Sequence, residues 1–301
     1  MNTLNKQKNK NRYLLDYRKD IASQFGEDGI IEKIFEILLP SNKWCIEFGA
    51  WDGEHFSNTY NLIQHHGWSG ILIEGDASRM SQIRETHAGK LVTAVNAFVA
   101  SSGPSSLNNL LSATDAPQDF DLLSIDIDGN DYHVWRGLTD YKPKVVVIEF
   151  NSFIPGNIEF VQEDSSAIVH GNSILSMTML AKEKGYKLIC INQENAFFVD
   201  AQYFNLFNID DNSIEALKHY KEPLQVFQLY DGTFRFHGAQ GMYYYGFPVD
   251  LNKRFQIFPA WLRRRGVLWK GGNWFTKLAI RFYRRINRAP ITDIWEWKNK
   301  Y

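Results

Sequence analysis

The chain has 301 residues, of which 44% are hydrophobic and 15% aromatic, and its formal net charge is −1. This apolar content is enough for one large domain, or for a domain with a sizeable appendage. The near-zero net charge gives no indication of a polyanionic partner. The two cysteines are too few for a metal site built from cysteines alone.

The cysteines and the N-terminal residues indicate the compartment. Cys45 and Cys190 each lie in an apolar run, which favours buried thiols in a reducing compartment over a disulfide. Residues 1–19 are polar and contain no apolar stretch typical of a signal peptide. No segment reaches the roughly 18 apolar residues of a membrane-spanning helix. We therefore expect a cytoplasmic protein.

Short apolar runs alternate with helical patterns between residues 44 and 203. The expected strands are 44–48, 70–73, 91–95, 121–127, 144–150, 187–191 and 196–199, and the expected helices are 57–66, 78–87, 132–138 and 173–184. Strands separated by helices imply right-handed crossovers and a mainly parallel sheet. Only residues 192–195 separate the last two strands, a spacing that predicts a hairpin.

The sequence thus predicts an α/β, Rossmann-like fold with a mainly parallel seven-stranded sheet whose last strand is antiparallel. We expect a helical lead-in over residues 1–40, the core over 41–205 and an aromatic, basic appendage over 206–301. The near-continuous apolar strands agree, because helices cover both faces of a parallel sheet.

A nucleotide-binding turn is expected after the first strand. Glu47 ends this strand and is followed by a Gly-x-x-x-Gly pattern at Gly49 and Gly53, glycines that would let the backbone approach a ligand. Glu74 ends the second strand, where an acid can accept hydrogen bonds from both ribose hydroxyls. Asp52 would repel the pyrophosphate of a dinucleotide, whereas a cationic sulfonium tolerates it. The charges favour S-adenosylmethionine over NAD.

Acidic side chains also follow the fourth and fifth strands. Asp126 and Asp128 belong to the fourth strand end, and Glu149 and Asn151 to the fifth. Ligands of open parallel sheets bind beyond these strand ends, so the four residues are expected in one cleft with Glu47. Asp128, Glu149 and Asn151 suit Mg²⁺ or Mn²⁺, which would lower the pKa of an acceptor hydroxyl. The alternatives are that one carboxylate is a general base, or that some of these groups cap loops.

Two histidines lie near this region in the sequence. His170 precedes Gly171 and the helix that follows the fifth strand, and it is a candidate base facing the acceptor. His133 belongs to the expected helix 132–138. The competing interpretation is that a loop histidine such as His170 is simply exposed to solvent.

Several motifs together resemble the FkbM-type methyltransferase family. The motifs are 23–28 (SQFGED), 46–50 (IEFGA), 57–59 (SNT), 67–70 (GWSG), 73–74 (IE), 125–129 (IDIDG) with Trp135 and Gly137, and 142–149 (KPKVVVIE). The resemblance covers about residues 22 to 200. It implies a class I methyltransferase fold, S-adenosylmethionine as donor, and O-methylation of a sugar or natural-product hydroxyl in a glycan or glycoconjugate.

The resemblance also assigns roles to individual residues. It implies that Glu47, Gly49 and Glu74 bind the donor, and that Asp126 lies between donor and acceptor. We add Gln24, Gly53, Asn96 and Asp126 to the donor-binding residues, and Asp126, Asp128 and His170 are the catalytic candidates. The sequence departs from the family at Asp128, where Glu is commoner, and in its C-terminal third. Some relatives are non-catalytic partners in secretory pathways, so a binding protein that has lost turnover is the alternative function.

The C-terminal third carries a basic segment. Residues 253–288 contain eleven Lys or Arg and no Asp or Glu, interleaved with aromatic residues. Such an amphipathic segment can pack its apolar face on the core, lie on an anionic membrane surface, or bind a lipid- or diphosphate-linked carbohydrate acceptor. Nucleic acid is a weaker alternative, because the Asn/Asp-Pro-Pro-aromatic motif of base methyltransferases is absent from the sequence.

Overall fold

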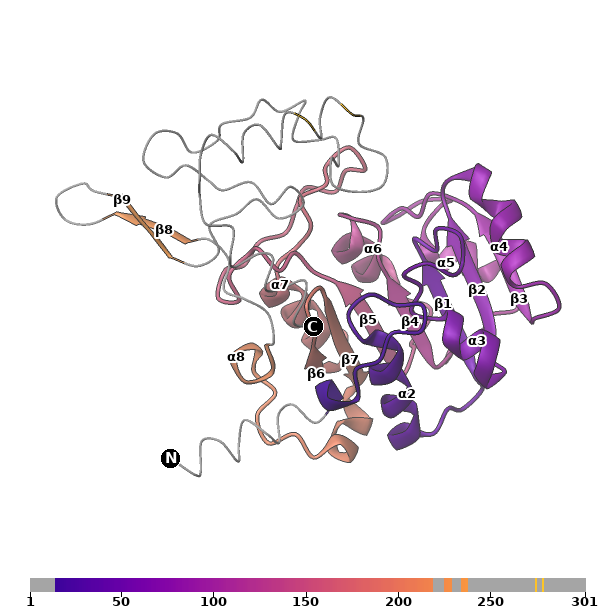
Figure 1. Ribbon diagram of the computed structural model, residues 1–301, viewed down its shortest axis with the longest axis horizontal. Helices are drawn as coiled ribbons and strands as arrows, with labels where there is room; N and C mark the ends of the chain where they lie inside the picture. Colours follow the sequence, from indigo (N-terminus) through magenta and orange to yellow (C-terminus); the bar gives the residue numbers. More distant parts are fainter. Residues whose placement is uncertain (1–13, 219–224, 229–233, 238–273, 275–277, 279–301) are drawn as a thin grey trace. The chain divides into compact units, whose positions relative to one another are not determined.

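The computed structural model describes residues 14–218, 225–228, 234–237, 274 and 278 (Figure 1). The chain divides into two compact units, Met1–Tyr220 and Lys221–Tyr301. The first unit holds the central sheet and its helices. In the second, β8 (Gln225–Gln228) pairs with β9 (Phe234–His237) as an antiparallel hairpin.

The first unit is built on a seven-stranded sheet of order β3-β2-β1-β4-β5-β7-β6. Its strands are β1 (Trp44–Phe48), β2 (Ser69–Glu74), β3 (Val92–Asn96), β4 (Leu122–Ile125), β5 (Val145–Glu149), β6 (Tyr186–Ile191) and β7 (Asn195–Asp200). The strands β1 to β5 pair in parallel, and β7 runs antiparallel between β5 and β6. The predicted fold class is confirmed, including the final hairpin.

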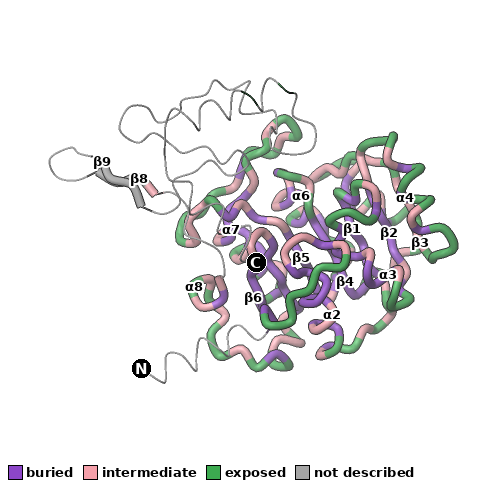
Figure 2. Tube along the Cα trace, in the orientation of Figure 1, coloured by how far each residue is buried: buried purple, intermediate pink, exposed green. Residues whose placement is uncertain are grey.

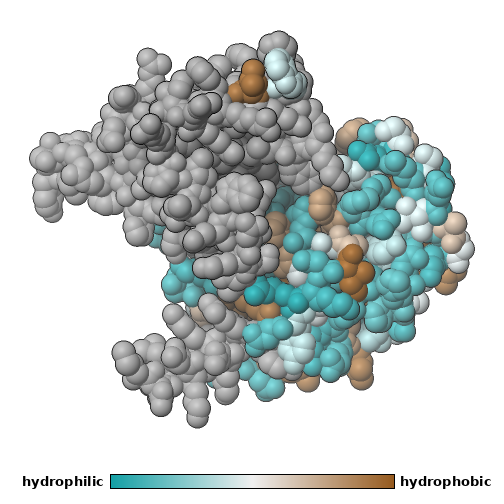
Figure 3. Space-filling model, viewed as in Figure 1, coloured by the Kyte–Doolittle hydropathy of each residue, from teal (hydrophilic) through white to brown (hydrophobic). Residues whose placement is uncertain are grey.

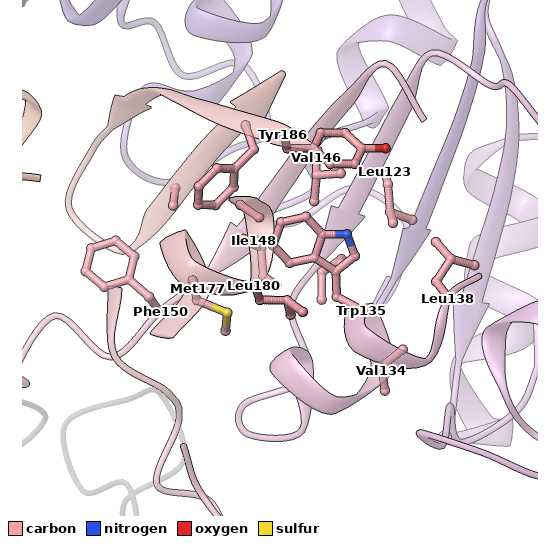
Figure 4. Close-up of a cluster of buried hydrophobic side chains, with 14 of the residues drawn as sticks. Leu123, Val134, Trp135, Leu138, Val146, Ile148, Phe150, Met177, Leu180 and Tyr186 are labelled. Carbon is pink, nitrogen blue, oxygen red and sulfur yellow. The ribbon is translucent and has the colours of Figure 1, made fainter. Parts of the chain in front are cut away.

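One face of the sheet packs against α5 (Leu107–Ser112), α6 (Asp131–Gly137), α7 (Ile174–Glu183) and α8 (Ile214–Leu217). Trp135 of α6 is fully buried here, with its ring against Tyr186 and Phe198. Figure 4 shows this indole among side chains from β4, β5 and α7. The burial of such a large aromatic group is a main source of hydrophobic stability for this layer.

The other face packs against η1 (Leu14–Tyr17), α2 (Glu27–Leu38), α3 (Tyr60–His66), α4 (Met80–Thr86) and η3 (Ala201–Phe207). The short η2 (Ala77–Arg79) leads into α4. Alternate strand residues supply the two cores, with Ile46 facing one layer and Cys45 the other. Figure 2 shows the result: the strands are buried at the centre, and the exposed chain lies in the outer helices and loops.

The sheet reverses its strand order next to β1, because the chain passes from β1 outward to β2 and β3 and then returns to β4 on the other side. This switch point leaves the carboxyl ends of β1, β2, β4 and β5 at one edge. Ligands of open α/β sheets bind at such an edge.

Some element boundaries differ from the sequence expectation. The helix expected from residue 57 begins at Tyr60; the Ser57 hydroxyl accepts from the Tyr60 amide at 3.0 Å, as a cap does, and donates to Glu47. The fourth strand ends at Ile125 rather than at residue 127, since Asp131 draws the following loop away from the sheet. The helix α5 was not expected; Ser106 caps it by accepting from the Asn109 amide.

The described surface is mixed. Figure 3 shows one face on which the described residues are mostly hydrophilic, with hydrophobic residues scattered among them, as is normal for a folded domain. Among the described residues, no helix combines the length and apolar character needed to cross a bilayer. The basic segment 253–288 lies outside the described residues except at Trp274 and Leu278.

Candidate active site

Glu47, at the penultimate position of β1, is almost fully buried. Its carboxylate accepts from the Ser57 hydroxyl at 2.6 Å, the Thr59 hydroxyl at 2.7 Å and the Asn58 amide at 2.8 Å. Burial raises its pKa, and the hydrogen bonds from Ser57 and Thr59 partly offset that rise. In the structure Glu47 therefore fixes the segment that leads into α3, and its contact with a donor stays a prediction.

The Gly49–Gly53 turn has left-handed backbone at both glycines, with φ of 78° and 81°. A Cβ on Gly49 would lie 1.7 Å from the Asp126 carbonyl oxygen, and one on Gly53 would lie 2.9 Å from Nε2 of His87. The space beside each glycine is thus filled by the protein itself, and the approach of a ligand to the backbone of this turn stays a prediction. Glycine is required here by the fold of the turn.

Glu74, the last residue of β2, holds this turn from the side. Its two carboxylate oxygens accept from the Trp51 and Asp76 amides, both at 2.8 Å. Asn96 pairs with Glu74 across β2 and β3 and donates to the Glu74 and Gly75 carbonyls at 2.8 and 3.1 Å. Each carboxylate oxygen has a further lone pair, so Glu74 can still accept from the hydroxyls of a ribose.

Asp126, Asp128 and Glu149 meet at the ends of β4 and β5. Each offers one carboxylate oxygen, and these oxygens lie within 4.8 Å of one another. Asp128 has a left-handed backbone with φ of 58°, a conformation that Asp tolerates better than most residues. The three residues form an open acidic cluster, in which Asp126 and Asp128 keep solvent-exposed atoms.

Asp131, the first residue of α6, shapes the loop that carries two of these acids. Its side chain is buried and accepts from the Ile127 and Gly129 amides, both at 2.9 Å. These bonds bend the chain between Asp126 and α6. Burial raises the pKa of Asp131 to about 6, even though both hydrogen bonds favour the charged form.

The carboxylates of the cluster raise one another's pKa values. Desolvation raises the pKa of Asp126 well above its usual value, and the charges of Asp131 and Asp128 add to the rise. Burial, followed by the charge of Asp126, does the same to Glu149. One carboxylate oxygen of Asp126 lies within 4.8 Å of one of Glu149. Like charges at this distance repel, so each of the two carboxylates raises the pKa of the other.

A fourth acid faces this cluster. Glu194, in the turn between β6 and β7, has an Oε1 atom that is buried and has no hydrogen-bond partner among the described residues. Burial raises its pKa to about 7, and the charges of Glu27 and Asp128 contribute. The cluster thus carries more negative charge than its own hydrogen bonds stabilise.

The segment between β5 and α7, residues 150–173, is fastened to the loop before α6 by buried side chains, among them Asn172, which donates to the Gly129 carbonyl at 2.7 Å, and Gln162. The Gln162 amide donates to Asn130 and to the Ile168 carbonyl, and its oxygen accepts from the His170 and Gly171 amides, at 3.0 to 3.1 Å. Every hydrogen-bonding position of that side chain is used. Gln162 and Asn172 therefore set how the long segment lies beside the acidic cluster.

Residues 104–188, which include the acidic cluster and Gln162, match the family model of the methyltransferase FkbM domain. Over this range the chain is similar to the FkbM-type methyltransferase domain. The match and the strand order together confirm the class I methyltransferase fold that the sequence resemblance implies. The predicted donor-binding residues Glu47, Gly49 and Glu74 precede the matched range.

Solved structures similar to this methyltransferase domain share little sequence with it. The CurJ carbon methyltransferase is 13% identical with a TM-score of 0.41, and the match covers 58% of this chain and 52% of the other. An S-adenosylmethionine-dependent methyltransferase from Clostridium acetobutylicum is 12% identical, with a TM-score of 0.39 and coverage of 66% and 99%. A putative caffeoyl-CoA O-methyltransferase from Staphylococcus aureus is 12% identical, with a TM-score of 0.41 and coverage of 62% and 87%.

The chain therefore spans about half the length of the CurJ structure, 52% of it. Among proteins of curated function, none matches the sequence significantly.

Asn151 forms its hydrogen bonds inside its own loop, donating to the His170 carbonyl at 2.7 Å and accepting from the Phe153 amide at 2.9 Å. Its place beside Asp128 and Glu149 in a metal site stays a prediction, and Asp126 joins those two acids in the structure.

Two further candidates are held by their backbones. The His170 amide donates to Gln162, and its carbonyl accepts from Asn151. No hydrogen bond joins the His170 ring to the acidic cluster within the part of the chain that the structure describes. Gln24 donates through its backbone amide to the buried Glu27 at 3.2 Å. The roles of His170 in catalysis and Gln24 in donor binding stay predictions.

Sequence reasoning missed the residues that hold the site in shape. Asp131, Gln162 and Glu194 were not singled out, although Asp131 follows Asp126 and Asp128 in one short acidic run. Nothing in the sequence around Gln162 marks it, because its partners lie in another loop. An aspartate at the first turn of a helix is a recognisable signal, whereas a buried glutamine clamp is visible only in three dimensions.

Proposed function

We propose that this chain transfers the methyl group of S-adenosylmethionine to a hydroxyl oxygen of a carbohydrate, in a glycan or glycoconjugate. The observation that carries the proposal is the acidic cluster Asp126, Asp128 and Glu149, within the matched methyltransferase domain and at the ligand-binding edge of the sheet. The carbohydrate class rests on the sequence resemblance. A lipid- or diphosphate-linked acceptor rests on the basic segment.

The chemistry of the neighbouring strand ends supports the donor. Glu74 presents a carboxylate at the end of β2, the position from which an acid accepts the hydroxyls of a ribose. The turn at 49–56 contains no Lys or Arg and includes Asp52 and Glu54. These charges suit a cationic sulfonium and oppose a pyrophosphate.

The acids can accept the proton that leaves the acceptor. The donor, when bound, supplies an electrophilic methyl group on a positively charged sulfur. As the acceptor oxygen bonds to the methyl carbon and the carbon–sulfur bond breaks, the hydroxyl proton passes to an unprotonated carboxylate of the cluster. Raised pKa values at Asp126 and Glu149 bring these groups closer to the hydroxyl in basicity, as general base catalysis requires. Positioning in line supplies much of the rate.

The cluster also has the oxygen ligands that Mg²⁺ or Mn²⁺ prefers. Asp126, Asp128 and Glu149 would hold such an ion, and the unbalanced negative charge that Glu194 adds favours a cation there. The ion would lower the pKa of the acceptor hydroxyl. Both versions of the mechanism use the same three side chains.

Calorimetry with S-adenosylmethionine tests the donor directly. We expect the wild-type chain to bind, and Glu74→Gln to bind about tenfold more weakly, because the neutral amide loses charge-assisted hydrogen bonds to the ribose. Glu85→Gln, which changes an exposed acid on α4, is the matched control and keeps wild-type affinity. Absence of binding by the wild type would favour a non-catalytic binding protein.

The acceptor and the metal are tested together. Glycans from a strain lacking this chain are incubated with the purified protein and isotope-labelled S-adenosylmethionine, and mass spectrometry measures the added CH₂ groups. Label transfer that persists in chelator supports the general base, and transfer that is lost and returns with Mg²⁺ or Mn²⁺ supports the metal. Transfer to nucleic acid instead of glycans would contradict the carbohydrate assignment.

A further inference from the structure

Two consecutive side chains at the end of α4 form hydrogen bonds to two consecutive carbonyls of the Gly49–Gly53 turn. The Thr86 hydroxyl donates to the Asp52 carbonyl at 3.3 Å, and Nε2 of His87 lies 2.8 Å from the Gly53 carbonyl. His87 is buried, with only 4% of its surface exposed. A buried histidine in contact with this turn has no part in the mechanism described above.

The hydrogen bonds around His87 determine which ring nitrogen carries the proton. Nε2 of Gln64 donates to the Thr86 carbonyl at 3.0 Å, which fixes the orientation of the Gln64 amide. The same amide nitrogen lies 3.0 Å from Nδ1 of His87, so Nδ1 must accept. Nε2 must then carry the hydrogen that is donated to Gly53.

We propose that His87, as the neutral Nε2–H tautomer, is a positioning residue that holds the Gly49–Gly53 turn in its donor-binding shape. The inference rests on the proposed function, because the turn is assigned to the donor there. Trp51 has φ of 48°, a left-handed conformation that costs energy in a residue with a Cβ, so outside contacts must balance this strain. The bond from His87 is one such contact, and the bond from Trp51 to Glu74 is another.

A second proton on His87 would loosen the turn. It would sit on Nδ1 and meet the Gln64 amide hydrogen, and rotating the Gln64 amide would break its bond to Thr86. The groups that face the ring are the Gly53 carbonyl, Glu54, Lys90 and the edge of Tyr60 at 5.9 Å between ring centroids.

The balance of these groups keeps the ring neutral. Burial lowers the pKa of His87, while the Gly53 carbonyl and the Glu54 charge partly oppose the shift and Lys90 adds to it. A histidine held neutral by the fold contributes stability that is present above the pKa of an unfolded histidine, near 6.5, and that is lost as the pH falls below it. The Gly49–Gly53 turn should therefore be more stable against local opening at pH 8 than near pH 5.5.

The first test needs no donor. Nitrogen-15 NMR of labelled histidine reads the tautomer, and hydrogen exchange followed by mass spectrometry reads the turn at residues 49–56. We expect His87 to carry its proton on Nε2, and His87→Phe to exchange faster over 49–56 at pH 8. His87→Gln, whose amide nitrogen can replace Nε2, should restore slow exchange. His65→Phe, at an exposed position on α3, is the matched control.

Donor binding gives the second readout. At pH 8 we expect the Kd for S-adenosylmethionine to rise about fivefold in His87→Phe, the value of one hydrogen bond, and to stay near wild type in His87→Gln. Wild type should bind more weakly at pH 5.5 than at pH 8, and His87→Gln should lose this dependence.

The results of these tests distinguish the role of His87 from the proposed function of the chain. A proton on Nδ1, or unchanged exchange over 49–56 in a folded His87→Phe variant, overturns the role of His87. If His87→Phe fails to fold, an equal pH dependence of exchange in wild type and His87→Gln overturns it. A wild type that shows the expected tautomer and exchange but binds no donor refutes the proposed function and leaves the positioning of the turn supported.

Discussion

Gly49 lies where the end of β1 passes against the end of β4, and no side chain fits there. An alanine would place its Cβ 1.7 Å from the Asp126 carbonyl oxygen, in a backbone with φ of 78°. We expect Gly49→Ala to lower the free energy of unfolding by about 3 kcal/mol or more, because the left-handed strain of about 1 kcal/mol is joined by a backbone clash. Urea denaturation measures the change.

Gly67→Ala is the matched control for that strain. Gly67 has φ of 68°, and a Cβ there would meet nothing within 4 Å. Its cost should be the left-handed strain alone, about 1 kcal/mol. Equal losses at the two positions would show that the contact with Asp126 is not tight, and that Gly49 is needed for its backbone conformation only.

Glu194 is expected to destabilise the fold at neutral and alkaline pH. Burial, and then the charges of Glu27 and Asp128, raise its pKa to about 7. A raised pKa means that the folded chain binds a proton more tightly than the unfolded one, so the stability from protonation is present below about pH 4.5 and is lost as the pH rises through about 7. Glu194→Gln should therefore raise the free energy of unfolding at pH 8 by about 1 to 3 kcal/mol.

The pH dependence distinguishes this effect from a change in packing. At pH 4.5 the same substitution should have little effect, since Glu194 is then protonated in the folded chain. The urea denaturations are run in chelator, because a divalent cation in the acidic cluster would stabilise the charged Glu194. A Glu194→Gln variant that is less stable than wild type at pH 8 would contradict the prediction.

The elements themselves were largely predictable from the sequence. Strands such as β5 are continuous apolar runs, and helices such as α7 have a clear start at Ser173, which accepts from the Ser176 amide. Boundaries were harder where side chains serve distant partners. The Ser57 hydroxyl accepts from the Tyr60 amide, as expected of a helix cap, but it also donates to Glu47 in another element. Local patterns cannot reveal such a distant partner.

The course of the segment between β5 and α7 was also not predictable from local sequence patterns, because its partners are distant in the sequence. The segment has no periodic pattern, yet buried side chains such as Gln162 and Asn172 hold it against the loop before α6. We expect Gln162→Glu to loosen it, since a second carboxylate oxygen would face the oxygen of Asn130 and the Ile168 carbonyl in place of a donor. Limited proteolysis should then cleave within residues 152–171, where the wild type resists.

The Gln162→Glu variant should lose methyl transfer while it keeps its affinity for the donor. We expect label transfer to glycans to fall at least about tenfold, because the segment lies against the loop before α6, while the Kd for S-adenosylmethionine changes less than about twofold. Gln82→Glu, on the exposed side of α4, is the matched control and should alter neither. Loss of donor binding in Gln162→Glu would indicate instead that the segment supports the whole strand edge.

At the scale of the whole molecule, the sequence predicted the mainly parallel sheet and the edge that carries the acids, because parallel strands bring their carboxyl ends together. The sequence did not predict how burial and neighbouring charges shift the pKa values of these acids. Asp126, Glu149 and Glu194 come from three separate strand ends, and their mutual effect on pKa depends on burial that no pattern encodes. The site was thus predictable in position and composition, but not in electrostatics.

The division of the chain into two units predicts that donor binding needs only the first unit. Glu74, Asn96 and the acidic cluster all belong to the unit Met1–Tyr220, whereas the basic segment belongs to Lys221–Tyr301. A fragment of residues 1–220 should therefore fold, as judged by circular dichroism and cooperative urea unfolding, and bind S-adenosylmethionine like the full chain. A fragment that folds but binds no donor would show that the second unit completes the site.

Membrane contact should depend on the second unit. Each Lys or Arg near an anionic surface contributes about 1 kcal/mol, and residues 253–288 contain eleven of them without an acid. In sedimentation with vesicles rich in anionic phospholipid, we expect the full chain to pellet and the fragment 1–220 to stay in the supernatant. Salt should release the full chain, because ions screen the attraction, and neutral vesicles should bind neither. If the full chain stays in the supernatant with anionic vesicles at low salt, the basic residues serve the acceptor or the protein core instead of a membrane.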